Sequence, residues 1–162
     1  SYPPYRLDGR AAFWAGWDAE RLYLAVRLED DQTIFSGKKR ERLKIVLRTE
    51  ERPLKVELTP REDGSVRIDL SGAAGGEGME ARCALLDRTI LNGSDLKKTA
   101  VRYGGIEIAI PWNTLGQIPE RGRIIGLDLF WTDTDREGKD LVGGTLRWAG
   151  KARKGGYLIL GE

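Results

Sequence analysis

Apolar side chains recur at every second position in six segments of this chain, and this rhythm limits its possible folds more than any other feature. The segments are 22–28, 43–48, 54–58, 66–70, 106–110 and 127–131. Successive side chains of a β-strand point to opposite faces, so each segment predicts a strand with one buried and one wetter face. A helix would need a period of 3.6 residues, which these segments lack.

Turn residues separate these segments at short intervals. A tight turn is indicated by Asp18-Ala19-Glu20-Arg21, and a hairpin by Asp63-Gly64. The isoleucine-rich strand 106–110 is expected to end at Pro111, because proline cannot donate a hydrogen bond to a neighbouring strand. Strands at this spacing predict an all-β, antiparallel two-sheet β-sandwich with one or two short helical turns. We expect irregular structure at 71–78, which is rich in glycine, and at 86–99, which contains Asn92-Gly93-Ser94-Asp95.

Length and charge narrow the class of protein further. The 162 residues fit one globular domain over residues 1–162, and no apolar run approaches the ~18 residues of a membrane-spanning helix. The 27 basic and 25 acidic residues are interspersed, so no nucleic-acid partner is expected. The densest basic run, Lys38-Lys39-Arg40 with Arg42, is interpreted as a solvated loop.

The chain lacks the residues on which much enzyme chemistry depends. There is no histidine, which removes histidine-activated nucleophiles and the common histidine zinc motifs. Cys83 is the single cysteine, so it has no intrachain disulfide partner, and its position in 81–85 predicts a buried strand residue. No spacing singles out a pair of carboxylates for glycoside hydrolysis. The sequence therefore predicts a binding domain and no enzyme.

Three stretches, in order and spacing, carry a family resemblance. The first stretch, residues 15–24, contains Trp17-Asp18 followed by Leu22-Tyr23. The second, residues 105–116, contains Glu107 and Ile110-Pro111-Trp112. The third, residues 122–135, contains Gly122, Gly126 and Asp128, followed by Asp133 and Asp135. Together they resemble carbohydrate-binding modules of family 9. Leu146-Arg147-Trp148 and Gly156–Leu160 are similar to the last strands of that family.

The resemblance implies a non-catalytic module that binds carbohydrate. It also implies a place beside other domains of a larger secreted or surface protein, and thus an extracellular or periplasmic location. The chain begins with Ser1, and we expect it to be a piece of something longer. Gly155 stands where the family carries a stacking tryptophan. The alternative is therefore a structural or protein-interaction β-sandwich that has lost the sugar site.

Aromatic and charged side chains supply the candidate ligand-binding residues: Trp14, Phe130, Trp131 and Arg27. Sugars are bound by aromatic rings against their C–H faces, with placed polar groups at the hydroxyls. Trp14 and Phe130 are out of phase with the apolar series, so they could face one groove if their strands are neighbours. Sheet packing is the alternative for both rings, and Trp131 shares the core parity of Leu129.

Asp133 and Asp135 form the candidate metal site. Hard carboxylate oxygens suit calcium, and the family resemblance implies that calcium can be bound. The surrounding loop lacks the full spacing of an EF-hand, so an ordinary acidic turn is the alternative. No other cofactor is expected.

Overall fold

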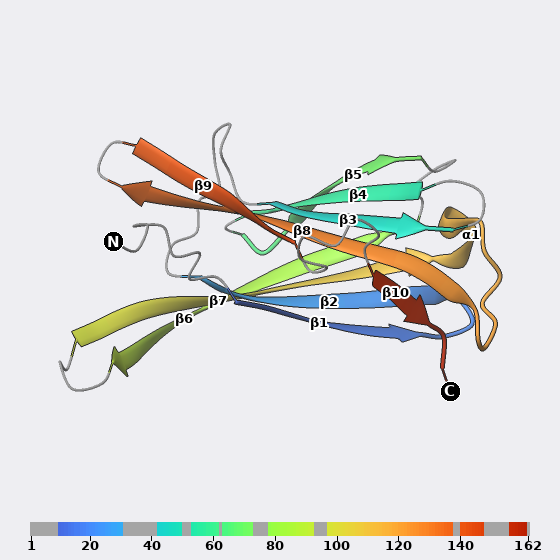
Figure 1. The fold of residues 1–162 in the computed structure, drawn as a ribbon, viewed down its shortest axis with the longest axis horizontal. Coiled ribbons are helices and arrows are strands. Elements are labelled where there is room, and N and C mark those ends of the chain that lie inside the picture. Colours follow the sequence, from blue (N-terminus) through green and yellow to red (C-terminus); the bar gives the residue numbers. More distant parts are fainter. Residues whose placement is uncertain are drawn as a thin grey trace.

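The computed structural model describes residues 10–30, 42–49, 53–61, 63–72, 78–92, 97–137, 140–147 and 156–161. In these residues the chain forms two antiparallel sheets that lie face to face (Figure 1). The helix found there, α1 (Trp112–Leu115), is a single turn that follows a strand ending at Pro111. The described part of the chain contains no helix with the length and apolar character needed to cross a bilayer.

The smaller sheet has four strands in the order β1-β2-β7-β6. Their bounds are β1 (Arg10–Trp17), β2 (Arg21–Asp30), β7 (Lys97–Pro111) and β6 (Glu80–Asn92). Each neighbouring pair is antiparallel, and β1 and β2 are joined by the turn at 18–20.

The larger sheet has six strands, of which five follow the order β10-β8-β3-β4-β5, while β9 also pairs with β8. Their bounds are β10 (Gly156–Ile159), β8 (Ile124–Glu137), β3 (Arg42–Arg48), β4 (Pro53–Pro60), β5 (Val66–Ser71) and β9 (Asp140–Arg147). The two sheets thus form the sandwich that the alternation predicted.

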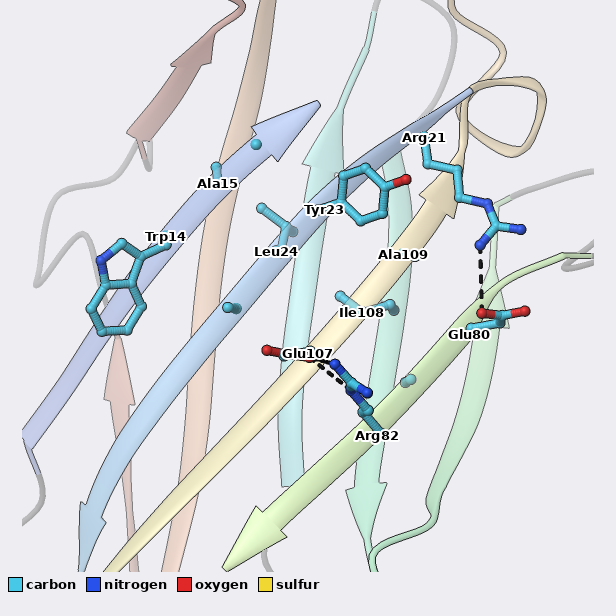
Figure 2. A pocket seen from close by; sticks show the side chains of 13 residues that line it. Trp14, Ala15, Arg21, Tyr23, Leu24, Glu80, Arg82, Glu107, Ile108 and Ala109 are labelled. Atoms are coloured by element: carbon cyan, nitrogen blue, oxygen red, sulfur yellow. Dashed lines mark hydrogen bonds and ion pairs between the residues drawn. The ribbon is translucent and has the colours of Figure 1, made fainter. Parts of the chain in front are cut away.

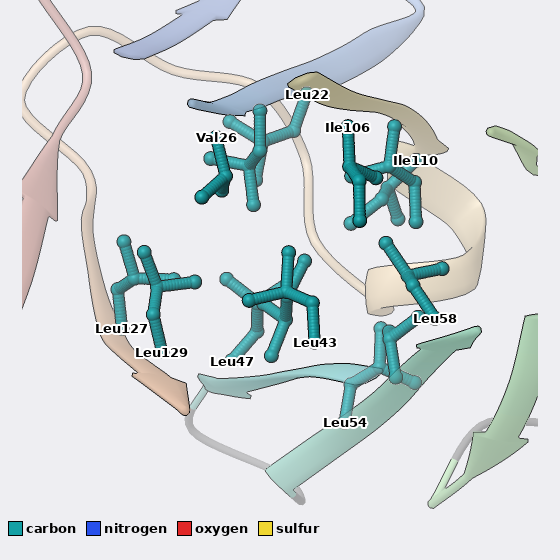
Figure 3. Close-up of a cluster of buried hydrophobic side chains, with 14 of the residues drawn as sticks. Leu22, Val26, Leu43, Leu47, Leu54, Leu58, Ile106, Ile110, Leu127 and Leu129 are labelled. Atoms are coloured by element: carbon teal, nitrogen blue, oxygen red, sulfur yellow. The ribbon is translucent and has the colours of Figure 1, made fainter. Parts of the chain in front are cut away.

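Alternate side chains of both sheets meet in one core between them. Leu22, Leu24 and Val26 of β2 point inward from the smaller sheet, and Ile45 of β3 and Val56 of β4 are fully buried in the larger one. Figure 3 shows leucine, isoleucine and valine side chains from the two sheets pointing toward one another. Burying a leucine or isoleucine stabilises a fold by about 1.5–3 kcal/mol. This cluster therefore fixes which face is left outside on each strand that contributes to it.

The prediction of irregular structure at 86–99 was wrong for the residues described there. Strand β6 continues to Asn92 and pairs with β7 from Lys97 onward, with Asn92 opposite Lys97. Residues 87–89 and 97–99 are polar or charged, so this stretch shows no apolar alternation. Backbone hydrogen bonds hold an antiparallel pair whatever its side chains, and the period-two pattern reports only strands with a buried face.

Candidate functional site

A groove of about 690 Å³ lies on the outer face of the smaller sheet, on the side away from the core. All four strands of that sheet contribute to it, and Figure 2 shows its side chains standing up from β1, β2, β7 and β6. We call it the outer groove. It is concave and carries both aromatic and charged groups, which is the usual form of a small-molecule site.

The strand register arranges the groove residues in two rows that run across the sheet. The first row is Trp14, Ala25, Glu107 and Arg82, and the second row is Gly16, Tyr23, Ala109 and Glu80. Small residues at 25 and 109 separate the aromatic side chains of β1 and β2 from the charged side chains of β7 and β6. The hollow therefore results from alanines placed between large side chains.

The aromatic side of the groove consists of Trp14 and Tyr23. Trp14 is 57% exposed and Tyr23 is 40% exposed, although both lie on regular strands of the sandwich. Their partners across the β1–β2 pair are Ala25 and Gly16, so neither ring is covered by the residue opposite it. Both rings therefore offer apolar surface at the groove.

Asp18 holds the Tyr23 ring in place. The Tyr23 hydroxyl donates a 2.7 Å hydrogen bond to Oδ2 of Asp18, while Oδ1 accepts from the backbone N–H groups of Glu20 and Arg21 at 2.8 Å. These bonds lower the pKa of Asp18, the Tyr23 bond contributing most, because they favour the charged carboxylate. The same bond raises the pKa of Tyr23, because the neutral phenol is the donor.

The turn that carries Asp18 is anchored to the core. The Trp112 indole N–H donates to the carbonyl oxygen of Asp18 at 2.8 Å, and its ring meets Trp17 edge to face, with centroids 6.3 Å apart. Trp112 is buried, and its backbone N–H also donates to the carbonyl of Glu20. The position of Tyr23 at the groove is thus fixed by a buried residue of another segment.

Two ion pairs form the charged side of the groove. Arg82 contacts Glu107 across the β6–β7 pair, with Nε and Nη2 at 2.8 and 2.7 Å from the same oxygen, Oε2. Arg21 reaches from β2 to Glu80 on β6, where Nη1 lies 3.5 Å from Oε2. Ion pairs as exposed as these contribute about 0–1 kcal/mol to stability. Their polar groups can therefore serve a ligand at little cost to the fold.

Comparison with known proteins gives matches among solved structures only. No protein-family model and no curated protein matches the sequence. A family 9 carbohydrate-binding module from Caldicellulosiruptor kristjanssonii, solved with cellotriose, superposes with a TM-score of 0.61 at 15% identity, over 98% of this chain and 78% of that chain. The module solved with glucose from this organism gives a TM-score of 0.60 at 17% identity, over 98% and 81%. A candidate carbohydrate-binding protein from Bacteroides uniformis ATCC 8492 gives 0.51 at 11% identity, over 97% and 80%.

The chain has a family 9-like fold. At these identities the similarity concerns the fold alone, and the motif-based expectation of a family 9-like sandwich is confirmed.

In the family 9-like domain, the four residues predicted to bind ligand do not lie together. Trp14 lines the outer groove, and Arg27 lies on the same outer face of β2 as Ala25 but outside the groove lining. Phe130 is half-buried on the outer face of the larger sheet, with Lys44 Nζ 5.7 Å from its ring centroid. Trp14 and Phe130 are therefore on opposite sides of the sandwich, which corrects the expectation that both could face one groove.

Trp131 belongs to the core of the family 9-like domain. Its side chain is 6% exposed and points inward with Leu127 and Leu129. A ring buried between two sheets has no free face for a ligand, so the structure corrects its place among the candidate ligand-binding residues. Position 131 continues the series of alternate apolar residues that includes Leu127 and Leu129, and this pattern predicted a core side chain.

Asp133 and Asp135 lie on β8, opposite Gly144 and Val142 of β9. In the part of the chain that the structure describes, no group of three or more acidic, cysteine or histidine residues could hold a metal ion. Calcium binding here stays a prediction, and Trp148 and Gly155 lie outside the described residues.

Sequence reasoning missed most of the groove. Tyr23, Glu80, Arg82 and Glu107 belong to it, yet each alternates with core residues in the manner of any solvated strand face. Only the register, which sets Trp14 in one row with Glu107 and Arg82, brings them together. A single sequence carries no direct signal of register between β2 and β7, which are far apart along the chain.

The larger sheet of the domain has a separate apolar patch on its outer face. Ile124 of β8 is opposite Ile159 of β10, and Tyr157 lies two residues along β10 on the same face. All three side chains are more than half exposed, Tyr157 at 61%. We call these residues the β8–β10 patch.

Replacing Asp18 should change the ionisation of Tyr23. With the carboxylate present, the Tyr23 phenol should ionise at a higher pH than an ordinary tyrosine, and Asp18→Asn should return its pKa toward 10.0 because the negative acceptor is gone. Any stabilisation from this pair is lost as pH rises through the raised Tyr23 pKa, and as pH falls through the lowered Asp18 pKa.

The absorbance of the phenolate measures the ionisation of Tyr23. The titration curve of Tyr23→Phe is subtracted, so that only the contribution of Tyr23 remains. An unchanged Tyr23 titration in Asp18→Asn would show that the hydrogen bond does not hold the ring in solution.

Proposed function

We propose that the domain binds carbohydrate in the outer groove and catalyses no reaction. The observation that carries this proposal is the Trp14 ring, which stands 57% exposed beside a hollow with charged groups on its far side. A sugar ring has an apolar C–H face and a rim of hydroxyl groups. The aromatic side of the groove suits the C–H face of the sugar, and the charged side suits its hydroxyl groups.

The dimensions of the groove support this function. Trp14 and Glu107 are separated in their row by Ala25 alone, so their backbones lie roughly 10 Å apart, which is two strand spacings. A single sugar ring fits between side chains that stand on these two strands. The similar folds solved with cellotriose and with glucose support a ligand of this class.

The biological setting belongs to the same proposal. A domain that binds a glycan without altering it serves to hold another activity near that glycan. We therefore place it in a larger secreted or surface protein, outside the cell or in the periplasm, with other domains of that protein as its neighbours.

Truncation of Trp14 tests the function. We expect the native domain to bind cellotriose, and Trp14→Ala to weaken that binding about 30-fold or more, because loss of a central aromatic contact typically costs ~2 kcal/mol. Isothermal titration calorimetry measures both affinities. The matched control is Tyr157→Ala, which removes an aromatic ring of similar exposure from the other sheet and should leave the affinity unchanged.

Equal losses in the two variants would place the sugar elsewhere on the molecule. Absence of heat from the native domain with cellotriose and with glucose would contradict carbohydrate binding itself.

Protein interaction is the second candidate function, and the β8–β10 patch favours it. Exposed apolar side chains that cluster on one face often mark a contact surface. If the patch joins two copies, light scattering will show a dimer that Ile124→Ser with Ile159→Ser converts to monomers. A native monomer whose carbohydrate binding survives both substitutions would leave the outer groove as the functional surface.

A further inference from the structure

The Arg82–Glu107 pair has an unusual arrangement of its hydrogen bonds. Both donors of Arg82, Nε and Nη2, go to one oxygen of Glu107, Oε2. These two contacts leave the second oxygen, Oε1, and the third nitrogen, Nη1, unused. The side chains are 82% and 56% exposed, so the pair presents one strong acceptor and one strong donor side by side to solvent.

The register directs this pair toward the aromatic side of the groove. Arg82 and Glu107 share a row with Trp14, and Ala25 is the small residue between them. In Figure 2 their side chains lie across the sheet from the Trp14 ring. A sugar that rests its C–H face on Trp14 therefore turns one edge, and the hydroxyl groups on it, toward the pair.

We propose that Arg82 and Glu107 together recognise two adjacent hydroxyl groups of the bound sugar. One hydroxyl donates to Glu107 Oε1 and its neighbour accepts from Arg82 Nη1. The inference rests on the proposed carbohydrate function and adds the chemical group that the site distinguishes. Hydrogen bonds to charged groups are the stronger ones, so this contact contributes to selectivity as well as to affinity.

The charges of the pair define the class of ligand further. The guanidinium and the carboxylate neutralise each other, so the pair offers no net charge to a ligand. A charged group on the sugar would be attracted by one member of the pair and repelled by the other, so it would gain little net electrostatic attraction. The favoured ligand is an uncharged sugar with two free neighbouring hydroxyl groups.

The second ion pair of the groove lacks these properties. Arg21 and Glu80 make one contact of 3.5 Å. Glu80 belongs to the row of Tyr23 and Ala109, and Arg21 lies beside that row. The Arg21 side chain is only 30% exposed. It is therefore the Arg82–Glu107 pair that presents an open donor and acceptor opposite Trp14.

Affinities for deoxy sugars test the proposal. The probes are glucose and its 2-deoxy, 3-deoxy and 4-deoxy forms, titrated into the native domain and into Arg82→Ala with Glu107→Ala. The control variant is Arg67→Ala with Asp69→Ala, which removes an exposed ion pair of the same kind from β5 on the other sheet. Circular dichroism verifies that both double variants keep the fold.

We expect removal of a hydroxyl at two adjacent positions to weaken native binding about tenfold each, as is typical for a hydrogen bond to a charged group. The Arg82/Glu107 variant should bind glucose weakly, and it should no longer distinguish glucose from those two deoxy forms. The Arg67/Asp69 variant should behave as the native domain does. Such non-additivity is the signature of direct contact between the pair and the hydroxyls.

Full discrimination among the deoxy sugars by the Arg82/Glu107 variant would overturn the inference, and so would losses at non-adjacent positions. In both cases glucose still binds, so the proposed function survives. If the native domain binds none of the four sugars, the inference fails together with the function on which it rests.

Discussion

The burial of one face of the core strands between the two sheets is the constraint from which the rest of the structure follows. Leu22, Leu24 and Val26 must point into the core, so Tyr23 and Ala25 must point out of it. A shift of one residue in register would exchange the two faces and expose the whole apolar series. The packing that stabilises the sandwich therefore also determines which side chains are available to a ligand.

The outer groove stands on a rigid frame. Its side chains stand on strands whose opposite faces are fixed in the core, and the turn that positions Tyr23 is bonded to buried Trp112. The polar groups at its edge are exposed ion pairs, which stabilise the fold little. Packing and the proposed ligand recognition thus occupy opposite faces of the same sheet, and residues of one face can be changed with little effect on the other.

The fold could be predicted from the sequence because it depends on local alternation. The two-residue rhythm located strands such as 22–28 and 43–48, and Pro111 marked the end of β7. The polar extension of β6 and β7 around Asn92 and Lys97 was missed, since its pairing depends on backbone hydrogen bonds and leaves no apolar pattern. Its side chains simply gave no local signal of a strand.

The site was predictable only in part, for a reason that lies in long-range register. Trp14 was identified because it is out of phase with Trp17 and the apolar series. The structure places it at an outward position of β1, at the edge of its sheet. Its partners Glu107 and Arg82 are distant in sequence and look like ordinary solvated residues there. Phe130 also occupies an outward position, but on the other sheet. The alternation of apolar residues shows which face of a strand is buried, and it does not show which sheet the strand joins.

Nuclear magnetic resonance of the tryptophan indole N–H groups tests the central claim most directly. The chain has five tryptophans, of which Trp112 and Trp131 are buried and Trp14 borders the outer groove. During titration with cellotriose, the Trp14 signal should move in proportion to occupancy while those of Trp112 and Trp131 stay in place. Saturable binding that leaves the Trp14 signal unmoved would show that the groove is not where this domain holds its ligand.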